Sequence, residues 1–338
     1  MVKKITKMIS LTVMIRVDGD SKIGMGHVYR SLNLAYVLKK NGHDVIFLTK
    51  NRIVKNLVSN SFECKMFLND GYDKVQKIIN RSKPDVIIID KLQEQTKLVN
   101  IFKKNCKCVV AIDYTGNNKQ IIDYGINMLY PKTGIINKNT ISGFEYSIMN
   151  KKLIYTKPID IKRKVKSLLV LQGGSDTHCF TPKIINALNT LSEDIKITVV
   201  LGPAFNCWST LKVALKDNQK RLNLLHNIKN MPTVMSKHDV AITAGGMTLL
   251  ELAHMGIPSV VICGEEFENE TAGLLQKKGF GINLGFGKKV SESDIALATK
   301  QLLESYDMRT QMNKAGKKLV DGKGVNRVAS AIIKLGLK

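Results

Sequence analysis

The sequence predicts an α/β fold with two doubly wound, Rossmann-like domains, and three observations support this prediction. The 338 residues exceed the usual size of one hydrophobic core. Short apolar runs alternate with segments of helical spacing, which is typical of parallel α/β sheets. The alternation restarts after a basic stretch at 157–166, which marks a boundary. The expected domains are therefore residues 1–156 and 157–338.

The first half opens with the apolar run LTVMIRV (11–17), which predicts a strand leading through a glycine-containing loop into a helix over 27–40. Asn41-Gly42 is expected to end this helix in a left-handed conformation. Further apolar runs predict strands at 44–49, 85–90, 108–113 and 126–130.

The second half repeats this order, with a strand, the turn QGGSD and a helix opened by Thr181-Pro182. Strands are expected at 167–171, 197–201, 239–243 and 258–262, and the last helices near 292–304, 307–318 and 325–335. Ligands of doubly wound sheets bind beyond the carboxyl ends of the strands, so we expect a binding cleft between the two domains.

Composition narrows the class of protein. The net charge of +24 favours anionic partners, but the lysines are scattered as on a solvated surface. The six cysteines lack the spacing of a zinc site and the density of a disulfide scaffold, so we expect free thiols and no metal. The N-terminus is a poor signal peptide, and no apolar run reaches the ~18 residues of a spanning helix. We expect a cytoplasmic protein without stable membrane insertion, of unknown oligomeric state.

The loop SKIGMGHVYR (21–30) is the first candidate site. Gly24 and Gly26 would let backbone N–H groups approach an anion at the helix start, and His27 is placed to act as an acid or base. A dinucleotide fingerprint would need a glycine at Tyr29 and an acid at Lys50, so a nicotinamide cofactor is disfavoured.

A simpler interpretation of the same loop is structural. In it His27 only caps the helix, and Arg16, Asp18 and Arg30 form an ordinary ion-pair cluster. The two interpretations overlap, because the arginines are expected to hold Asp18 and the loop in shape even where His27 is catalytic.

Two further glycine turns follow predicted strands in the second half. In QGGSD, Gly173, Gly174 and Ser175 suit an N–H-lined turn, while Asp176 either caps the helix or faces substrate. In AGGMTLLE (244–251), the start of a helix follows the glycines. Thr248 would donate to a phosphate and Glu251 would accept from ribose hydroxyls, or the two form a capping box.

These motifs together resemble a known family. RVDGDSKIGMGHVYR is similar to the N-terminal signature of the UDP-sugar hydrolases of pseudaminic acid biosynthesis and of related spore-coat polysaccharide proteins. QGGSD and AGGMTLLELAHMGIP resemble their nucleotide-binding loops, and the resemblance spans most of the chain. The signature is an Arg-x-Asp start, a Gly-x-Gly-His turn and a following Arg, matched here by Arg16, Asp18, Gly24, Gly26, His27 and Arg30.

The resemblance implies a GT-B fold and hydrolysis of a UDP-linked amino sugar, in which water attacks the anomeric carbon and UDP leaves with inversion. It implies a catalytic role for His27 and Asp18 in the first domain, a nucleotide-sugar site in the second, and no cofactor. The expected substrate-binding residues are Arg16, Gly24, Gly26, Arg30, Asp90, Gly173, Gly174, Ser175, Asp176, Gly245, Gly246, Met247, Thr248, Glu251 and Asn269.

Two positions depart from the pattern of these relatives. Asn269-Glu270 stands where they often have Asn-Gln, and Leu92 stands at an aromatic position, so the sugar contacts are expected to differ. The alternative functions are a GT-B glycosyltransferase that passes the sugar to a glycan or lipid, and a non-catalytic basic protein that binds nucleic acid. The scarcity of aromatic residues, 6%, argues against the last, so no nucleic-acid partner is expected.

Overall fold

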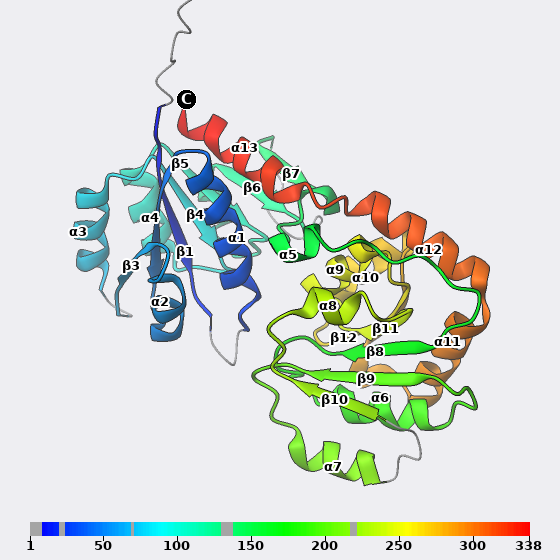
Figure 1. Ribbon diagram of the computed structural model, residues 1–338. Coiled ribbons are helices and arrows are strands. Elements are labelled where there is room, and N and C mark those ends of the chain that lie inside the picture. Colours follow the sequence, from blue (N-terminus) through cyan, green and yellow to red (C-terminus); the bar gives the residue numbers. More distant parts are fainter. Residues whose placement is uncertain (1–8, 20–23, 69–70, 130–137, 217–221) are drawn as a thin grey trace, which may run out of the picture. The chain divides into compact units, whose positions relative to one another are not determined.

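The computed structural model describes residues 9–19, 24–68, 71–129, 138–216 and 222–338 (Figure 1). The chain divides into two compact units. The first unit contains the residues up to 148 together with 323–338, and the second unit contains 149–322.

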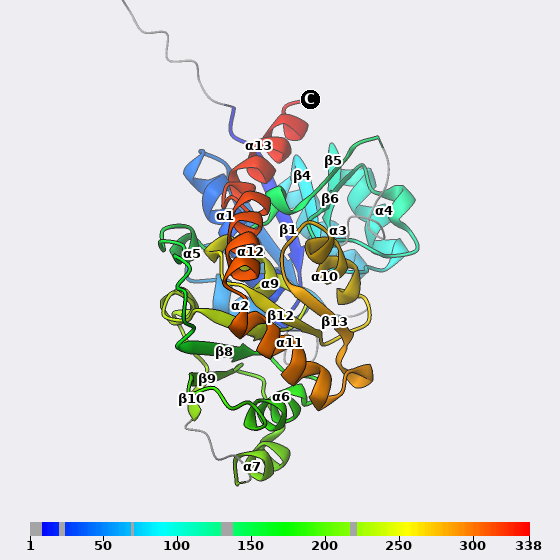
Figure 2. The same ribbon diagram turned by 90° about the vertical axis from the view of Figure 1, so that its right-hand side faces the viewer.

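The last helix makes this division differ from the expected domains 1–156 and 157–338. Helix α13 (Gly324–Gly336) belongs to the first unit, where it packs on α1 (Gly26–Lys40), as both views show (Figure 1, Figure 2). One stripe of its apolar side chains, including Val328 and Ile332, is fully buried there. A helix with one apolar stripe must bury that stripe, and sequence periodicity does not reveal which unit receives it.

The first unit is built on a seven-stranded parallel sheet with the strand order β3-β2-β1-β4-β5-β6-β7. The strands are β1 (Thr12–Val17), β2 (Asp44–Thr49), β3 (Glu63–Met66), β4 (Val86–Asp90), β5 (Cys108–Ile112), β6 (Tyr124–Asn127) and β7 (Thr140–Ser142). The other helices are α2 (Arg52–Val58), α3 (Tyr72–Ser82), α4 (Thr96–Asn105) and the short η1 (Lys119–Ile121) and η2 (Phe144–Tyr146).

The two faces of this sheet are covered by different helices. Val75 and Ile79 of α3 and Leu98 and Phe102 of α4 pack against alternate strand residues such as Ile87. Helices α1 and α13 contact the sheet through strands such as β1 and β4. Because both faces are buried, β4 is apolar at every position until the chain reaches Asp90.

The second unit has a six-stranded parallel sheet with the strand order β10-β9-β8-β11-β12-β13. Its strands are β8 (Ser167–Leu171), β9 (Lys196–Leu201), β10 (Leu222–His226), β11 (Val240–Thr243), β12 (Ser259–Cys263) and β13 (Ile282–Phe286). Its helices are α5 (Lys151–Ile154), α6 (Phe180–Asn189), α7 (Trp208–Lys216), α8 (Met231–Met235), α9 (Met247–Met255), α10 (Glu268–Lys277), η3 (Gly287–Lys289), α11 (Glu292–Glu304) and α12 (Tyr306–Leu319).

Most of the expected elements are present, and some bounds differ. Gly42 and Gly256 have the left-handed conformation that ends α1 and α9. The strand expected at 126–130 is β6, which begins and ends earlier, and residue 130 lies outside the described residues. No helix in the described part of the chain is long and apolar enough to span a membrane.

The cysteine prediction is wrong for one pair. Cys179 and Cys207 form a disulfide, whereas Cys64, Cys106, Cys108 and Cys263 are free. The bridge joins the turn after β8 to the turn after β9. Because β8 and β9 are neighbours in the parallel sheet, these turns lie at the same edge, although the two cysteines are 28 residues apart in sequence.

Candidate active site

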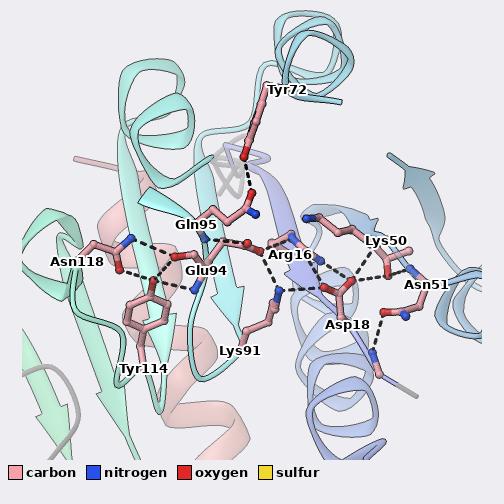
Figure 3. A network of polar contacts seen from close by, with 12 residues as sticks. Arg16, Asp18, Lys50, Asn51, Tyr72, Lys91, Glu94, Gln95, Tyr114 and Asn118 are labelled. Carbon is pink, nitrogen blue, oxygen red and sulfur yellow. Dashed lines mark hydrogen bonds and ion pairs between the residues drawn. The ribbon is translucent and has the colours of Figure 1, made fainter. Parts of the chain in front are cut away.

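The first polar network of the first unit surrounds Arg16, which is fully buried at the end of β1 (Figure 3). Its guanidinium donates to both oxygens of Asp18 over 2.6 and 2.5 Å, and its Nε lies 2.8 Å from Glu94 Oε2. Lys91 reaches the same two carboxylates, at 3.0 Å from Asp18 and 3.1 Å from Glu94. Two cations and two carboxylates therefore form a closed, neutral cluster.

Asp18 is committed to this cluster. Besides its contacts with Arg16 and Lys91, it accepts a hydrogen bond from the backbone N–H of Lys50 (Figure 3). It also accepts a hydrogen bond from Thr49 Oγ1. Burial alone would raise the pKa of Asp18, but the hydrogen bonds and charges of Arg16 and Lys91 outweigh it and lower the pKa far below its ordinary value. Asp18 links the ends of β1 and β2, and its pairing with Arg16 agrees with the structural interpretation of the loop, whereas the expected third member, Arg30, is not in this cluster.

The second polar network surrounds Arg30, whose expected partner was Asp18. Arg30 instead pairs with Asp90 at the end of β4, through contacts of 2.6 to 3.1 Å, and with Asp113 after β5, at 2.6 Å. Burial would lower the pKa of Arg30, and the two carboxylates more than reverse this. The sequence prediction had the right residue and the wrong carboxylates, because the order β1-β4-β5 that gathers them is not visible locally.

Asp90 links this network to His27. Its carboxylate lies 3.0 Å from His27 Nδ1 and also accepts a 2.7 Å hydrogen bond from Ser31 Oγ. Burial would raise the pKa of Asp90, but the charge of Arg30 and the contact with His27 lower it to about 2. Asp90 is completely buried and both its oxygens accept hydrogen bonds from protein groups, so in this structure it holds Arg30, Ser31 and His27 together, while its expected contact with substrate stays a prediction.

Asp113 connects the Arg30 network to the backbone that follows β6. Its Oδ1 accepts hydrogen bonds of 2.8 Å from the backbone N–H groups of Met128 and Leu129, and its backbone has a left-handed conformation with φ of 49°. A non-glycine residue in this conformation requires support from its surroundings, which the buried Arg30 supplies.

His27 is the partly exposed member of the network. Its side chain is 21% exposed, and Nδ1 lies 3.0 Å from both Asp90 Oδ1 and Arg30 Nη2. Nδ1 donates if protonated and accepts from Arg30 if not, so the tautomer decides which contact is a hydrogen bond. Within the described residues Nε2 has no partner.

The glycines beside His27 leave open space. A Cβ atom added at Gly24 or Gly26 would meet no heavy atom within 4 Å among the described residues, and Gly24 has φ of 78°. Helix α1 has no side-chain cap at Met25. The first N–H groups of α1 therefore have no side-chain acceptor at the cap, and their expected contact with an anion stays a prediction, because residues 20–23 of the loop lie outside the described residues.

In the QGGSD turn of the second unit, the two glycines have free space beside them in the described part of the chain, whereas Asp176 is held by hydrogen bonds. Added Cβ atoms at Gly173 and Gly174 would meet nothing within 4 Å among the described residues, and Ser175 Oγ contacts only Thr177, at 3.1 Å. Asp176 accepts 2.8 Å hydrogen bonds from the N–H groups of the next helix, at Phe180 and Thr181. Of the two roles expected for Asp176, the structure therefore contains the cap.

Helix α9 begins without a side-chain cap at Gly246, so the capping box expected from Thr248 and Glu251 is wrong. Thr248 lies inside the first turn rather than at the cap. Within the described residues neither the Thr248 hydroxyl nor the Glu251 carboxylate has a hydrogen-bond or ion-pair partner. Glu251 is partly buried, and burial raises its pKa to about 7. Two polar side chains and the uncapped N–H groups of Met247 and Thr248 thus share one helix start, while the Leu249 N–H already donates to the Gly246 carbonyl over 3.0 Å.

Gly245 and Asn269 are engaged with other protein groups. The Gly245 N–H donates to Glu268 Oε2 over 3.2 Å, and Asn269 Oδ1 accepts a 2.7 Å hydrogen bond from Asn283. Sequence analysis did not identify Glu268, Glu94 or Lys91 as site residues. The available signal was their position in the segments between a strand and the next helix, Lys91 and Glu94 after β4 and Glu268 at the start of α10, but such residues more often serve as caps.

Two parallel α/β units, each with glycine turns and polar side chains at the carboxyl ends of its strands, define the class of Rossmann-like double-domain proteins with the GT-B fold. Acinetobacter baumannii MurG is a solved structure of this kind. It matches with a TM-score of 0.71 and 14% identity, covering 96% of this chain and 99% of that chain.

The comparisons with sequences are consistent with this class. Residues 168–326 match the glycosyltransferase family 28 C-terminal domain. The spore coat polysaccharide biosynthesis protein SpsG of Bacillus subtilis is 26% identical over 93% of this chain and 96% of its own length. The uncharacterized protein MJ1062 of Methanocaldococcus jannaschii is 31% identical over 77% of this chain, which spans 57% of that protein.

A sugar transferase is also among the relatives. The UDP-N-acetylglucosamine--N-acetylmuramyl-(pentapeptide) pyrophosphoryl-undecaprenol N-acetylglucosamine transferase of Carboxydothermus hydrogenoformans is 23% identical over 87% of this chain and 91% of its own length. Together the comparisons show a GT-B fold for this chain and sequence similarity to glycosyltransferases and to a polysaccharide biosynthesis protein.

Proposed function

We propose that this chain is an enzyme that takes a sugar from a UDP-sugar and passes it to an acceptor hydroxyl. The observation that carries the proposal is the start of α9, where the first N–H groups have no side-chain cap and the side chains of Thr248 and Glu251 have no partner among the residues that the structure describes. Unsatisfied donors at a helix N-terminus favour phosphate. A carboxylate with no protein partner suits the two hydroxyls of a ribose.

In this proposal the second unit holds the nucleotide. The α9 N–H groups and the Thr248 hydroxyl donate to the diphosphate, and Glu251 accepts from the ribose. The Gly173-Gly174 turn contributes backbone at a place with room for a close approach. These donors also stabilise the negative charge that UDP gains as it leaves.

The first unit supplies the base. With the Nδ1 proton donated to Asp90, His27 Nε2 carries the lone pair and takes the proton from the acceptor hydroxyl. The acceptor oxygen then forms a bond to the anomeric carbon, and the bond from that carbon to the UDP oxygen breaks, with its electron pair leaving on UDP. A single displacement of this kind inverts the anomeric configuration.

Hydrolysis is the second candidate, with water as the acceptor. The N-terminal signature around Arg16, Asp18 and His27 favours it, because it resembles that of UDP-sugar hydrolases acting on amino sugars of the pseudaminic acid type. The roles of the two units are the same in both candidates, and they differ only in which oxygen reaches the anomeric carbon.

A panel of UDP-sugars, incubated with and without glycan and lipid acceptors, tests the proposal. UDP release that depends on an acceptor identifies a transferase, and release of free sugar without one identifies a hydrolase. His27→Ala should lower turnover by about 10²–10⁴-fold, while His226→Gln, at an exposed position of β10, serves as the control. Unchanged turnover in His27→Ala would exclude the assigned role.

Nucleic-acid binding makes a different prediction. Such binding would weaken steeply with added salt, whereas binding of UDP to a built site saturates and responds little to salt. The same preparation can be tested for both, and the expectation of no nucleic-acid partner stays a prediction until then.

A further inference from the structure

We infer that Glu268 is a positioning residue that holds the Gly245–Gly246 turn in the form that opens the start of α9 to a diphosphate. The inference rests on the proposed function for its ligand. The contacts that support it all lie in the second unit and involve the carboxylate of Glu268.

Three backbone N–H groups converge on Glu268 Oε2. They belong to Gly264 at 2.7 Å, Gly245 at 3.2 Å and Glu265 at 3.4 Å. Gly245 follows β11 and Gly264 follows β12, which are neighbouring parallel strands. The carboxylate therefore ties together two strand-end turns that share no backbone hydrogen bond with each other in the described residues.

The fit of the turn against Glu268 is close. A Cβ added at Gly245 would lie 2.8 Å from Glu268 Cβ, and one at Gly246 would lie 3.1 Å from Glu268 Oε1. Gly245 thus lacks a side chain because Glu268 occupies that space. Gly246, the cap position of α9, is packed against the other oxygen of the same carboxylate.

These contacts give a reason for a carboxylate to lie beside a proposed diphosphate site, where its negative charge is unfavourable. Burial raises the pKa of Glu268, and the three N–H donors act against that rise. The residue's contribution is an acceptor at a fixed place, since two glycines in sequence have wide conformational freedom and do not fix the direction of their own N–H groups. The negative charge itself works against a diphosphate.

Geometry and charge can be separated with two variants. Glu268→Gln keeps an acceptor oxygen at the same reach and removes the charge, whereas Glu268→Asp keeps the charge and withdraws the oxygens by one methylene. Glu266→Gln is the matched control, because Glu266 is exposed and pairs only at the surface with Lys289, at 3.2 Å.

The experiment measures UDP binding by calorimetry and amide hydrogen exchange of the segment 244–250 in the whole chain. We expect Glu268→Asp to weaken UDP binding about tenfold or more and to speed exchange. Glu268→Gln should bind UDP at least as tightly as the wild type, with exchange unchanged, and so should Glu266→Gln.

Two results would overturn the inference. One is equal binding and exchange in the Asp and wild-type chains, and the other is loss of binding in Glu268→Gln with unchanged exchange, which would make the charge the active property. If the wild-type chain binds no UDP, the proposed function fails instead. Exchange of 244–250 in the two variants then still decides whether Glu268 holds the turn.

Discussion

Glu251 provides a sharp test, because it should destabilise the protein that carries it. Its carboxylate is partly buried without a protein partner in the described residues, and its pKa is raised from its ordinary 4.5 to about 7 by burial. Between these two pH values the folded chain holds a proton that the unfolded chain has released. The free energy of unfolding therefore falls as the pH rises through this window, and above it the loss caused by Glu251 is complete and no longer changes with pH.

The size of the effect follows from the same two values. Each pH unit in the window costs about 1.4 kcal/mol, so the loss reaches about 3 kcal/mol at pH 7 and above for full burial. Solvent that reaches the carboxylate reduces this figure in proportion. Glu251→Gln removes the ionisation and should be more stable than the wild type at pH 8, by up to that amount, and equal to it below about pH 4, where Glu251 is protonated in both the folded and the unfolded chain.

Urea unfolding followed by the fluorescence of Trp208 measures this difference. Trp208 is the only tryptophan of the chain and lies in the second unit, as does Glu251. With a slope of about 2 kcal/mol per molar urea, the midpoints at pH 8 should differ by up to about 1.5 M. Other titrating groups cancel between the two chains.

Binding supplies the second half of the test. If Glu251 holds a ribose, the variant should bind UDP about tenfold more weakly, because a neutral amide is a poorer acceptor than a carboxylate. A stability difference that does not change with pH, or a variant less stable than the wild type at pH 8, would refute the reasoning.

Three further changes test other parts of the molecule. Asp90→Asn leaves the buried Arg30 with one carboxylate. The variant should lose about 3 kcal/mol of unfolding free energy, measured by circular dichroism, and most of its turnover. This cost should shrink as the pH falls from about 4 toward 2, where Asp90 itself gains its proton, and a cost independent of pH would contradict the ion pair. Asp176→Ala removes the cap of α6 and should cost about 1 kcal/mol. Unchanged Trp208 midpoints would contradict the cap. Replacing Cys179 and Cys207 by serine should cost about 3 kcal/mol, and a reducing agent should bring the wild type to the same midpoint.

The interior strands were predictable from the sequence and the edge strands were not. β3, β7, β10 and β13 were missed, and each lies at an outer edge of its sheet. None of their residues is buried, so they lack the continuous apolar runs by which strands such as β4 were found. A continuous apolar run identifies a strand that is buried on both faces of its sheet. An edge strand is partly exposed and does not need such a run.

The candidate site divides in a similar way. His27 and the glycine turns are recognisable because the relevant residues are adjacent in sequence. The partners of Arg30 are 60 and 83 residues away, and Glu268 is 23 residues from Gly245. These contacts depend on which strands become neighbours. For this reason sequence reasoning paired Arg30 with the nearby Asp18 instead.

The placement of α13 in the first unit has a consequence for how the chain folds during synthesis. The second unit is one continuous segment, 149–322, and can fold as soon as it has emerged from the ribosome. The first unit is begun earlier, yet it lacks the helix that covers α1 until residues 324–336 have been made. The half of the protein that is translated first is therefore completed last, and until then the apolar surface that α13 covers is exposed to solvent.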